Sequence, residues 1–415
     1  MSSTFNSKPY KGTRDFYPQE SVINPDKTVD YTIYQSYIFS IWRKTLINLG
    51  FSEYDASIIE NADIYIAKSG KELGSDQLYN FLDKGDRKIA LRPEMTPTLA
   101  RMIANKRQNL RFPLRWFSIP NCFRYEQPQK GRLREHWQVN VDILGLKAES
   151  GIEIEMLMLV KELYQAFGAN QENLKVEINS RKVMDSWLFH YNLSEHQAQI
   201  YAIVDNWKKL TNDLRMKALN QFLINEQSQN VFNLCNKNNT EWEVYLDLAS
   251  KSDDLKTIIK QIKNLGTNFE ISPVIIRGQA YYTGVVFEVF DKNISNSRSL
   301  FGGGRYDNLM DLYNDNSLPA IGFGSGDVTW YEFLQNWKLL DGHLSFENWK
   351  KTNYPIKVGL IPTNIDSLEE IYSKIIPELI NQNKAWDIDY DYTRNEKKRI
   401  ETLYKRGCEE VIKIN

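Results

Sequence analysis

The sequence predicts an α+β protein: an antiparallel sheet flanked by helices, with an inserted helical lobe and a small C-terminal α/β domain. Residues 123–145 have the pattern of strand, basic loop and strand. Residues 185–264 are rich in Asn, Lys and Gln and poor in glycine, which is typical of helices, and residues 355–415 alternate strand with helix. The expected divisions are a main domain of residues 1–184 and 265–340, the lobe 185–264, a linker 341–354 and a C-terminal domain 355–415.

Composition narrows the class of protein. A chain of 415 residues suggests two or three domains, and a net charge of -1 gives no global basic field, so a nucleic acid would meet local basic patches. The three cysteines are widely spaced and the four histidines scattered, so we expect no disulfide framework and no metal site. The first ten residues lack a signal-like apolar segment and no stretch approaches a membrane span, which together indicate a cytoplasmic enzyme.

The hairpin of residues 123–145 has two distinct faces. Side chains alternate between the faces of a strand, so the apolar residues of each arm separate from its polar residues. A solvated face explains one charged hairpin, but matching polar sets elsewhere in the chain favour a binding face. The polar set is Arg124, Glu126, Gln138, Asn140 and Asp142, and the connecting loop adds Lys130, Arg132 and Arg134.

Before the hairpin, hydrophobic spacing predicts a helix over residues 26–49, capped by Asp26 or Thr28. The expected strands are 54–59, 77–83 and 87–92, and a helix is expected from residue 98. Between them, Glu94 and Thr96 lie in a turn held by two prolines. A carboxylate and a hydroxyl two residues apart suit an ammonium ligand, although Thr96 could instead cap the helix.

After the hairpin we expect a helix at 152–167 and a strand at 175–179, and two apolar strands within residues 274–290. Arg277 lies between those two strands. A buried arginine needs an anionic partner, so Arg277 either pairs with Glu288 or clamps a phosphate or carboxylate. Glycines at 302–304 and 320–326 allow backbone to approach a ligand closely, and no GKS or GKT follows them, so they form no P-loop.

The run FRYEQPQKGR, residues 123–132, closely resembles motif 2 of the class II aminoacyl-tRNA synthetases in its histidyl-tRNA synthetase form. Residues 274–290 and 301–307 resemble the histidine-specific motif, and residues 320–330 resemble motif 3. The resemblance implies a class II catalytic core and a histidine–tRNA ligase that uses L-histidine, ATP with Mg²⁺, and tRNA(His). It also implies a homodimer formed through residues 26–59 and an anticodon-binding C-terminal domain.

The resemblance also assigns individual roles. Arg124 and Arg277 would be catalytic at the α-phosphate, and ATP would be held by Arg124, Glu126, Arg132 and His136. Histidine would be held by Glu94, Thr96, Gln138, Asp142, Arg277, Tyr281 and Tyr282. The tRNA acceptor end would meet Gln129, Lys130 and Arg134.

The sequence departs from the family pattern at a few positions. At the position of Asp142 the family commonly has Glu, and at the position of His136 it often has a Phe that stacks on adenine. At the position of Thr329 most of the family has an arginine that binds the γ-phosphate. Arg305 is our candidate replacement for that missing cation. Two other classes stay open: a non-catalytic regulatory paralogue of histidine biosynthesis, and a class II synthetase for proline, threonine or glycine. The intact motif 2 arginines argue against the first, and the Arg277 signature and the absence of an editing-sized insertion argue against the second.

Overall fold

The computed structural model of the chain describes residues 7–19, 30–68, 76–129, 131–145, 151–266, 268–276, 282–293, 299–313 and 317–415. The chain divides into two compact units, Met1–Thr13 with Ile38–Trp337, and Arg14–Tyr37 with Lys338–Asn415. The finer division into main domain, lobe and linker stays a prediction. Within the described residues, no helix combines the length and apolar character that a membrane span requires.

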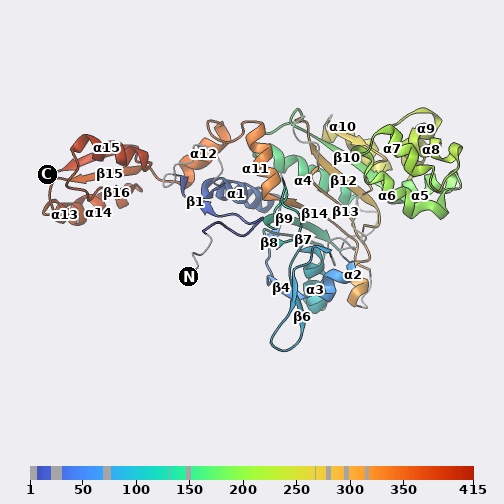
Figure 1. The fold of residues 1–415 in the computed structure, drawn as a ribbon, viewed down its shortest axis with the longest axis horizontal. Coiled ribbons are helices and arrows are strands. Elements are labelled where there is room, and N and C mark those ends of the chain that lie inside the picture. Colours follow the sequence, from blue (N-terminus) through green and yellow to red (C-terminus); the bar gives the residue numbers. More distant parts are fainter. Residues whose placement is uncertain are drawn as a thin grey trace, which may run out of the picture. The chain divides into compact units, whose positions relative to one another are not determined.

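A large sheet runs through the first unit (Figure 1). Its described strands follow the order β11-β10-β12-β13-β14-β9-β7-β3, with β8 paired to β9. The central pairs are antiparallel as predicted, whereas the outer pairs β10–β11 and β3–β7 are parallel. The bounds are β3 Ser52–Glu53, β7 Leu114–Ser118, β8 Asn121–Phe123, β9 Glu135–Leu144, β10 Leu174–Ser180, β11 Phe269–Ile271, β12 Val285–Asp291, β13 Ser299–Arg305 and β14 Ala320–Gly326.

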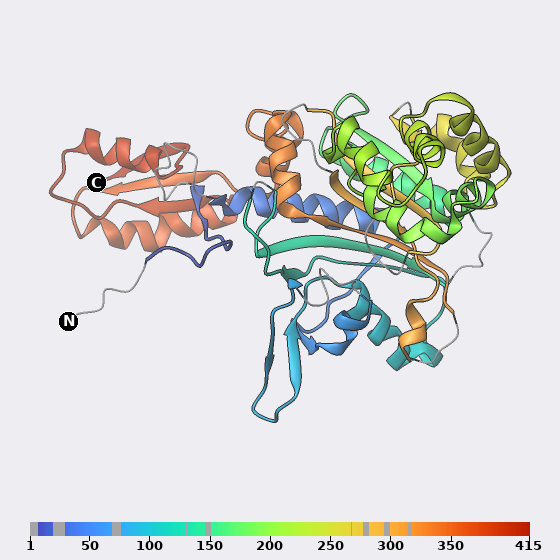
Figure 2. The same cartoon turned by 45° about the vertical axis from the view of Figure 1, so that its right-hand side comes forward.

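Helices cover both faces of this sheet (Figure 2). On one face, α4 (Ile152–Ala166) and α11 (Asp327–Asn336) enclose an aromatic core in which Trp330 packs on Trp42, Phe167 and Phe301. On the other face, α3 (Thr96–Lys106) packs its apolar side on Val286, Tyr306 and Ala320 of the sheet region. Leu144 of β9 belongs to the same cluster, so alternation along the strand places Gln138, Asn140 and Asp142 on the α3 face of the sheet. Arg124 and Glu126 of the predicted polar face instead follow the end of β8 at Phe123 in a segment without strand pairing, and both are only partly buried.

A small antiparallel sheet of β4 (Ile59–Asn61), β6 (Lys88–Leu91) and β5 (Asn80–Leu82) leads into α3, with α2 (Asp63–Lys68) beside it. The inserted segment between β10 and β11 is helical, as predicted. Its helices are α5 Arg181–His190, α6 Gln197–Val204, α7 Asn212–Leu219, α8 Asn225–Cys235, α9 Asn239–Lys251 and α10 Lys256–Leu265.

The second unit contains the predicted parallel α/β fold. Its strands β15 (Lys357–Pro362), β16 (Ala385–Ile388) and β17 (Glu410–Ile414) pair in the order β16-β15-β17. The crossovers are α15 (Glu396–Lys405) and a helix in three parts: α13 Ser367–Glu370, the π-helical Ile371–Ile375 and α14 Ile376–Asn381. The same unit holds β1 (Phe16–Tyr17), β2 (Asp30–Tyr31) and α12 (Leu344–Asn353), which lies within the expected linker.

Two predicted strands are wrong. Residues 54–58 form no strand, because the side chains of Asp55 and Ser57 accept hydrogen bonds from the amides of Ala56 and Ile59 and compete with strand pairing. Residues 274–276 also form no strand. The strand lies earlier, at β11, and is followed by Pro273, which has no amide to donate to a sheet. The predicted first helix appears as α1, Thr32–Asn48, and its expected caps fall outside the described residues.

Candidate active site

Strand β9 carries a row of buried polar side chains. Gln138, Asn140 and Asp142 are 5%, 3% and 1% exposed, and they alternate with the fully buried Val139 and Val141. The Gln138 amide donates to the side-chain oxygen of Asn140 at 2.6 Å. Burial of three polar groups in a row requires partners or a ligand, because an unsatisfied buried polar group is costly.

The glycines of β14 make space beside this row. Gly322 pairs with Asp142 and Gly324 with Asn140 in the antiparallel register, so their side-chain positions share one face of the sheet. A Cβ atom on Gly322 would clash with the Asp142 carboxylate, and one on Gly324 would lie 2.9 Å from the Gln138 amide nitrogen. The glycine-rich strand therefore serves the polar row by leaving room for its side chains.

Asp142 is the least exposed member of the row. Burial raises its pKa to about 7, a hydrogen bond from the Tyr306 hydroxyl to Oδ1 opposes that rise, and the charge of Glu94 adds to it. Its Oδ2 atom is buried and has no hydrogen-bond partner among the described residues. A ligand with an N–H donor would satisfy this oxygen. Sequence analysis missed Tyr306, although the residue directly follows the noted glycines and Arg305.

Glu94 and Thr96 lie where β6 leads into α3, and both are buried. Thr96 is the first helical residue, and the N-cap is Met95, which makes no side-chain capping bond, so the capping alternative for Thr96 is wrong. Arg124 connects this segment to β9. Its Nε donates to the Pro93 carbonyl at 2.8 Å, and an Nη lies 3.4 Å from Gln138 Oε1. The structure thus brings the expected ammonium site, Arg124 and the polar row together.

Comparison with known proteins identifies the family of the chain. The family model for histidyl-tRNA synthetase matches residues 39–326. The chain belongs to the histidyl-tRNA synthetase family. It is 41% identical to the histidine–tRNA ligase of Leptospira biflexa serovar Patoc over 348 residues, which cover 81% of this chain and 76% of the relative. It is 34% identical to the chloroplastic/mitochondrial histidine–tRNA ligase of Arabidopsis thaliana, with 80% and 67% coverage.

A solved histidyl-tRNA synthetase from Nostoc sp. PCC 7120 has the same fold. The TM-score is 0.75 at 22% sequence identity, and the match covers 97% of this chain and 90% of that chain. The predicted class II fold is confirmed by this likeness.

The tip of the hairpin carries the residues expected to meet ATP in this histidyl-tRNA synthetase family member. Backbone hydrogen bonds of 3.0 and 2.9 Å between Gln129 and Arg132 close a tight turn, in which Gly131 has a φ of 75°. Arg132 Nη1 lies 3.4 Å from Glu126 Oε2. The Gly131 amide donates to Glu332 of α11 at 3.0 Å, so the turn is attached to the motif 3 helix. Lys130 lies outside the described residues.

Arg134 differs from Arg132, the other arginine of the loop, because it is only 6% exposed. Its guanidinium lies 4.0 Å from the Tyr125 ring centroid and donates to the Tyr10 hydroxyl at 3.0 Å and to the Glu126 carbonyl at 3.1 Å. These contacts hold the N-terminal segment on the hairpin. We therefore leave Arg134 out of the proposed tRNA contacts. His136, on β9, is also buried.

Thr329 stands where most of the family has the motif 3 arginine, and its hydroxyl is hydrogen-bonded within the chain. The Thr329 hydroxyl lies 2.9 Å from the Gly326 carbonyl oxygen and 3.1 Å from that of Leu300. The idea that Arg305 replaces the cation is wrong. Arg305 is buried in ion pairs with Glu153 at 2.6 Å and Asp307 at 2.9 Å, and its charge is already compensated.

The structure describes only part of residues 274–290, which resemble the histidine-specific motif. Arg277 and Tyr281 lie outside the described residues, so their expected roles stay predictions. Tyr282 is buried in the same apolar cluster as Tyr306 and Leu99. A Cβ on Gly304 would lie 2.8 Å from the Tyr282 ring, so this glycine admits the tyrosine. Tyr282 thus shares a cluster with the tyrosine that contacts Asp142.

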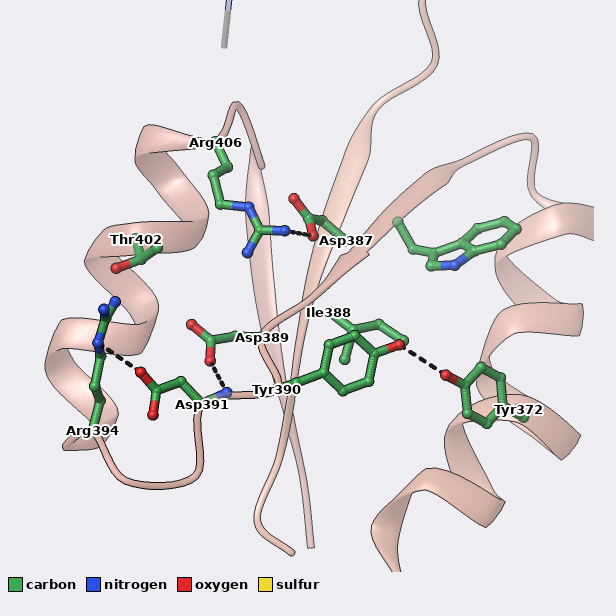
Figure 3. Close-up of a pocket in the computed structure, with 10 residues that line it drawn as sticks. Tyr372, Asp387, Ile388, Asp389, Tyr390, Asp391, Arg394, Thr402 and Arg406 are labelled. Atoms are coloured by element: carbon green, nitrogen blue, oxygen red, sulfur yellow. Dashed lines mark hydrogen bonds and ion pairs between the residues drawn. The ribbon is translucent and has the colours of Figure 1, made fainter. Parts of the chain in front are cut away.

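A separate cavity of about 510 Å³ lies in the C-terminal α/β fold (Figure 3). It is open and lined by aromatic and charged side chains, including Trp386, Tyr390 and Arg394. Arg406 pairs with Asp387 there, and Arg394 pairs with Asp391 at 2.8 Å. Among the described residues, no cluster of three or more His, Cys, Asp and Glu side chains could hold a metal ion.

Proposed function

We propose that this chain is an aminoacyl-tRNA ligase that activates L-histidine with ATP and transfers it to the 3′ end of tRNA(His). The observation that carries the proposal is the buried row on β9, in which Asp142 Oδ2 has no hydrogen-bond partner among the described residues. Arg124 joins this row to the segment of Glu94 through its contacts with Gln138 and the Pro93 carbonyl. The relatives named above as histidine–tRNA ligases support the same reading.

The first step joins the histidine carboxylate to ATP. A carboxylate oxygen attacks the α-phosphorus, the bond to the β-phosphate oxygen breaks, and pyrophosphate leaves. Arg124 and Arg277 reduce the repulsion between the two anions and stabilise the charge that develops on the phosphate. The carboxylate is already a nucleophile, so positioning replaces a strong base. In the second step a ribose hydroxyl of the tRNA attacks the histidyl carbonyl and loses its proton, the bond between that carbonyl and the phosphate oxygen breaks, and AMP leaves.

Selection of histidine rests on buried polar groups. Glu94 and Thr96 bind the α-ammonium through charge-assisted and neutral hydrogen bonds. Asp142 accepts from an imidazole N–H through Oδ2, and Gln138 adds a polar contact. Tyr281 and Tyr282 enclose the ring. An amino acid without the matching donor leaves these groups unpaired and is rejected.

ATP occupies the hairpin loop. Glu126 accepts from the adenine amino group, His136 stacks on the base, and Arg132 binds the γ-phosphate. The Arg132–Glu126 pair of 3.4 Å is therefore exchanged for contacts to ATP. ATP would carry Mg²⁺, whose charge would offset that of the phosphates, and no protein ligand is assigned to it.

The macromolecular contacts complete the proposal. Gln129 and Lys130 meet the acceptor end of the tRNA, and the cavity of the C-terminal domain meets its anticodon end. Two chains form a homodimer through residues 26–59, and the enzyme acts in the cytoplasm. Sedimentation of the purified chain at micromolar concentration tests the dimer, and a monomer there contradicts it.

The reaction is tested by ATP–pyrophosphate exchange with each amino acid in turn. We expect exchange with histidine alone. The absence of exchange at saturating ATP and histidine contradicts the enzyme and supports the regulatory paralogue. Exchange with proline, threonine or glycine in place of histidine supports the other class II specificity.

A further inference from the structure

Arg181, the first residue of α5, contacts the two described residues on either side of segment 277–281. Its Nε donates to the Ile276 carbonyl at 3.3 Å, and its Nη1 donates to the Tyr282 carbonyl at 3.0 Å. Its own backbone amide donates to the Gly284 carbonyl at 3.1 Å. One residue at the start of the helical insertion therefore binds the backbone on both sides of residues 277–281.

The neighbouring Asn179 holds the approach to the same segment. Its side-chain nitrogen donates to the Pro273 carbonyl at 3.2 Å and to the Ile275 carbonyl at 2.9 Å, and the residue is 1% exposed. Its side-chain oxygen accepts from the hydroxyl of the fully buried Tyr245 on α9. The end of β10 and the inserted helices thus form one hydrogen-bonded support for the backbone of residues 273–276 and 282–284.

Tyr282 depends on this support. Its side chain is buried in the cluster that contains Tyr306, and Tyr306 donates to Asp142. Its ring lies against Gly304 of β13, where no side-chain atom of residue 304 intervenes. A shift of the Tyr282 backbone would move the ring within a close-packed cluster, and close-packed interiors transmit such shifts.

We propose that Arg181 is a positioning residue for histidine binding: by holding the Ile276 and Tyr282 carbonyls, it fixes the Tyr282 ring beside Tyr306 and Asp142. The proposal rests on the proposed function, in which Tyr282 encloses the imidazole. Arginine suits the task because its planar guanidinium presents several donors in a fixed geometry and reaches two carbonyls at once. Lysine, with a compact ammonium on a flexible stem, lacks that fixed fork.

The test measures pyrophosphate exchange by Arg181→Met, Arg181→Lys and the matched control Lys182→Met. Lys182 is the next residue on α5, and its exposed side chain pairs with Asp254 at 3.0 Å. We expect Arg181→Met to raise the KM for histidine about tenfold, with a KM for ATP within about threefold of wild type. The KM for histidine of Arg181→Lys should lie between those of Arg181→Met and wild type. The KM for histidine of Lys182→Met should match wild type.

The split between the two KM values separates positioning from general damage. A variant that only misfolds lowers the amount of active enzyme and so lowers kcat, with both KM values unchanged. That result for Arg181→Met, or an equal rise in both KM values, overturns the proposal. If Arg181→Met does not fold, the decision falls to Arg181→Lys, for which a wild-type KM for histidine overturns it. Loss of exchange in the wild-type chain instead overturns the proposed function itself.

Discussion

The polar row on β9 and the cavity of the C-terminal domain differ in how far solvent reaches their side chains. Asp142 is 1% exposed, whereas Trp386 and Tyr390 are 38% and 54% exposed. Asp142 bonds to a neutral hydroxyl, whereas Asp387 and Asp391 of the cavity pair with arginines. A small ligand can be recognised by buried groups that it alone satisfies, whereas exposed aromatic and charged groups suit a flexible macromolecule.

The largest expected effect concerns the buried polar row on β9. We expect Asp142→Asn to raise the KM for histidine about ten- to hundredfold, because a hydrogen bond to a charged group contributes about 1.5–3 kcal/mol. Pyrophosphate exchange at varied histidine measures the change. The matched control is Asp387→Asn in the C-terminal domain, which should leave exchange unchanged. A wild-type KM for D142N would remove Asp142 from the histidine site.

The same variant also tests how the stability of the fold depends on pH. Burial raises the pKa of Asp142 from 3.8 to about 7, so between these values the folded protein holds a proton that the unfolded chain releases. The contribution of Asp142 to stability therefore falls as pH rises through that window. Asn does not titrate, so the Tm of D142N relative to wild type should rise from pH 5 to pH 8. A difference in Tm that stays constant with pH would contradict the raised pKa.

The sequence predicts the alternation of β9 well, because the period of two is written in consecutive residues. The contact between Asp142 and Tyr306 depends on the pairing of β13, β14 and β9, and no local pattern encodes that register. Charge alone also misled the interpretation of Arg134 and Arg305. Both look like free cations in the sequence, yet folding surrounds one with tyrosines and the other with carboxylates.

For the exposed cavity of the C-terminal domain we predict a smaller effect, on the transfer of histidine to tRNA. We expect Trp386→Ala to lower kcat/KM for tRNA aminoacylation about tenfold, because one base stacked on an aromatic ring contributes about 1–3 kcal/mol. Pyrophosphate exchange, which needs no tRNA, should not change. Tyr404→Ala is the control, since Tyr404 is 52% exposed on α15 and does not line the cavity. Equal aminoacylation by all three proteins would separate the cavity from tRNA binding.

The smallest expected effect concerns Thr329 on α11. Its hydroxyl already satisfies backbone carbonyls, and its methyl group lies 3.6 Å from where a Cβ of Gly131 would be. An arginine introduced here would stand three residues before Glu332 on the helix, a spacing at which opposite charges attract by about 0.2–0.5 kcal/mol. Glu332 also accepts from the Gly131 amide, so the new cation would be partly neutralised before it met a phosphate.

We therefore expect Thr329→Arg to leave the KM for ATP within about threefold of wild type, or to lower it slightly, since one added charge-assisted contact is opposed by the Glu332 pair and the lost hydroxyl bonds. Thr329→Val, which removes only the hydroxyl, isolates the second of these losses. Exchange at varied ATP measures both variants. A drop of a hundredfold in the KM for ATP would mean that Arg124, Arg132 and Arg277 leave the triphosphate poorly held. Such a result would place the γ-phosphate beside residue 329.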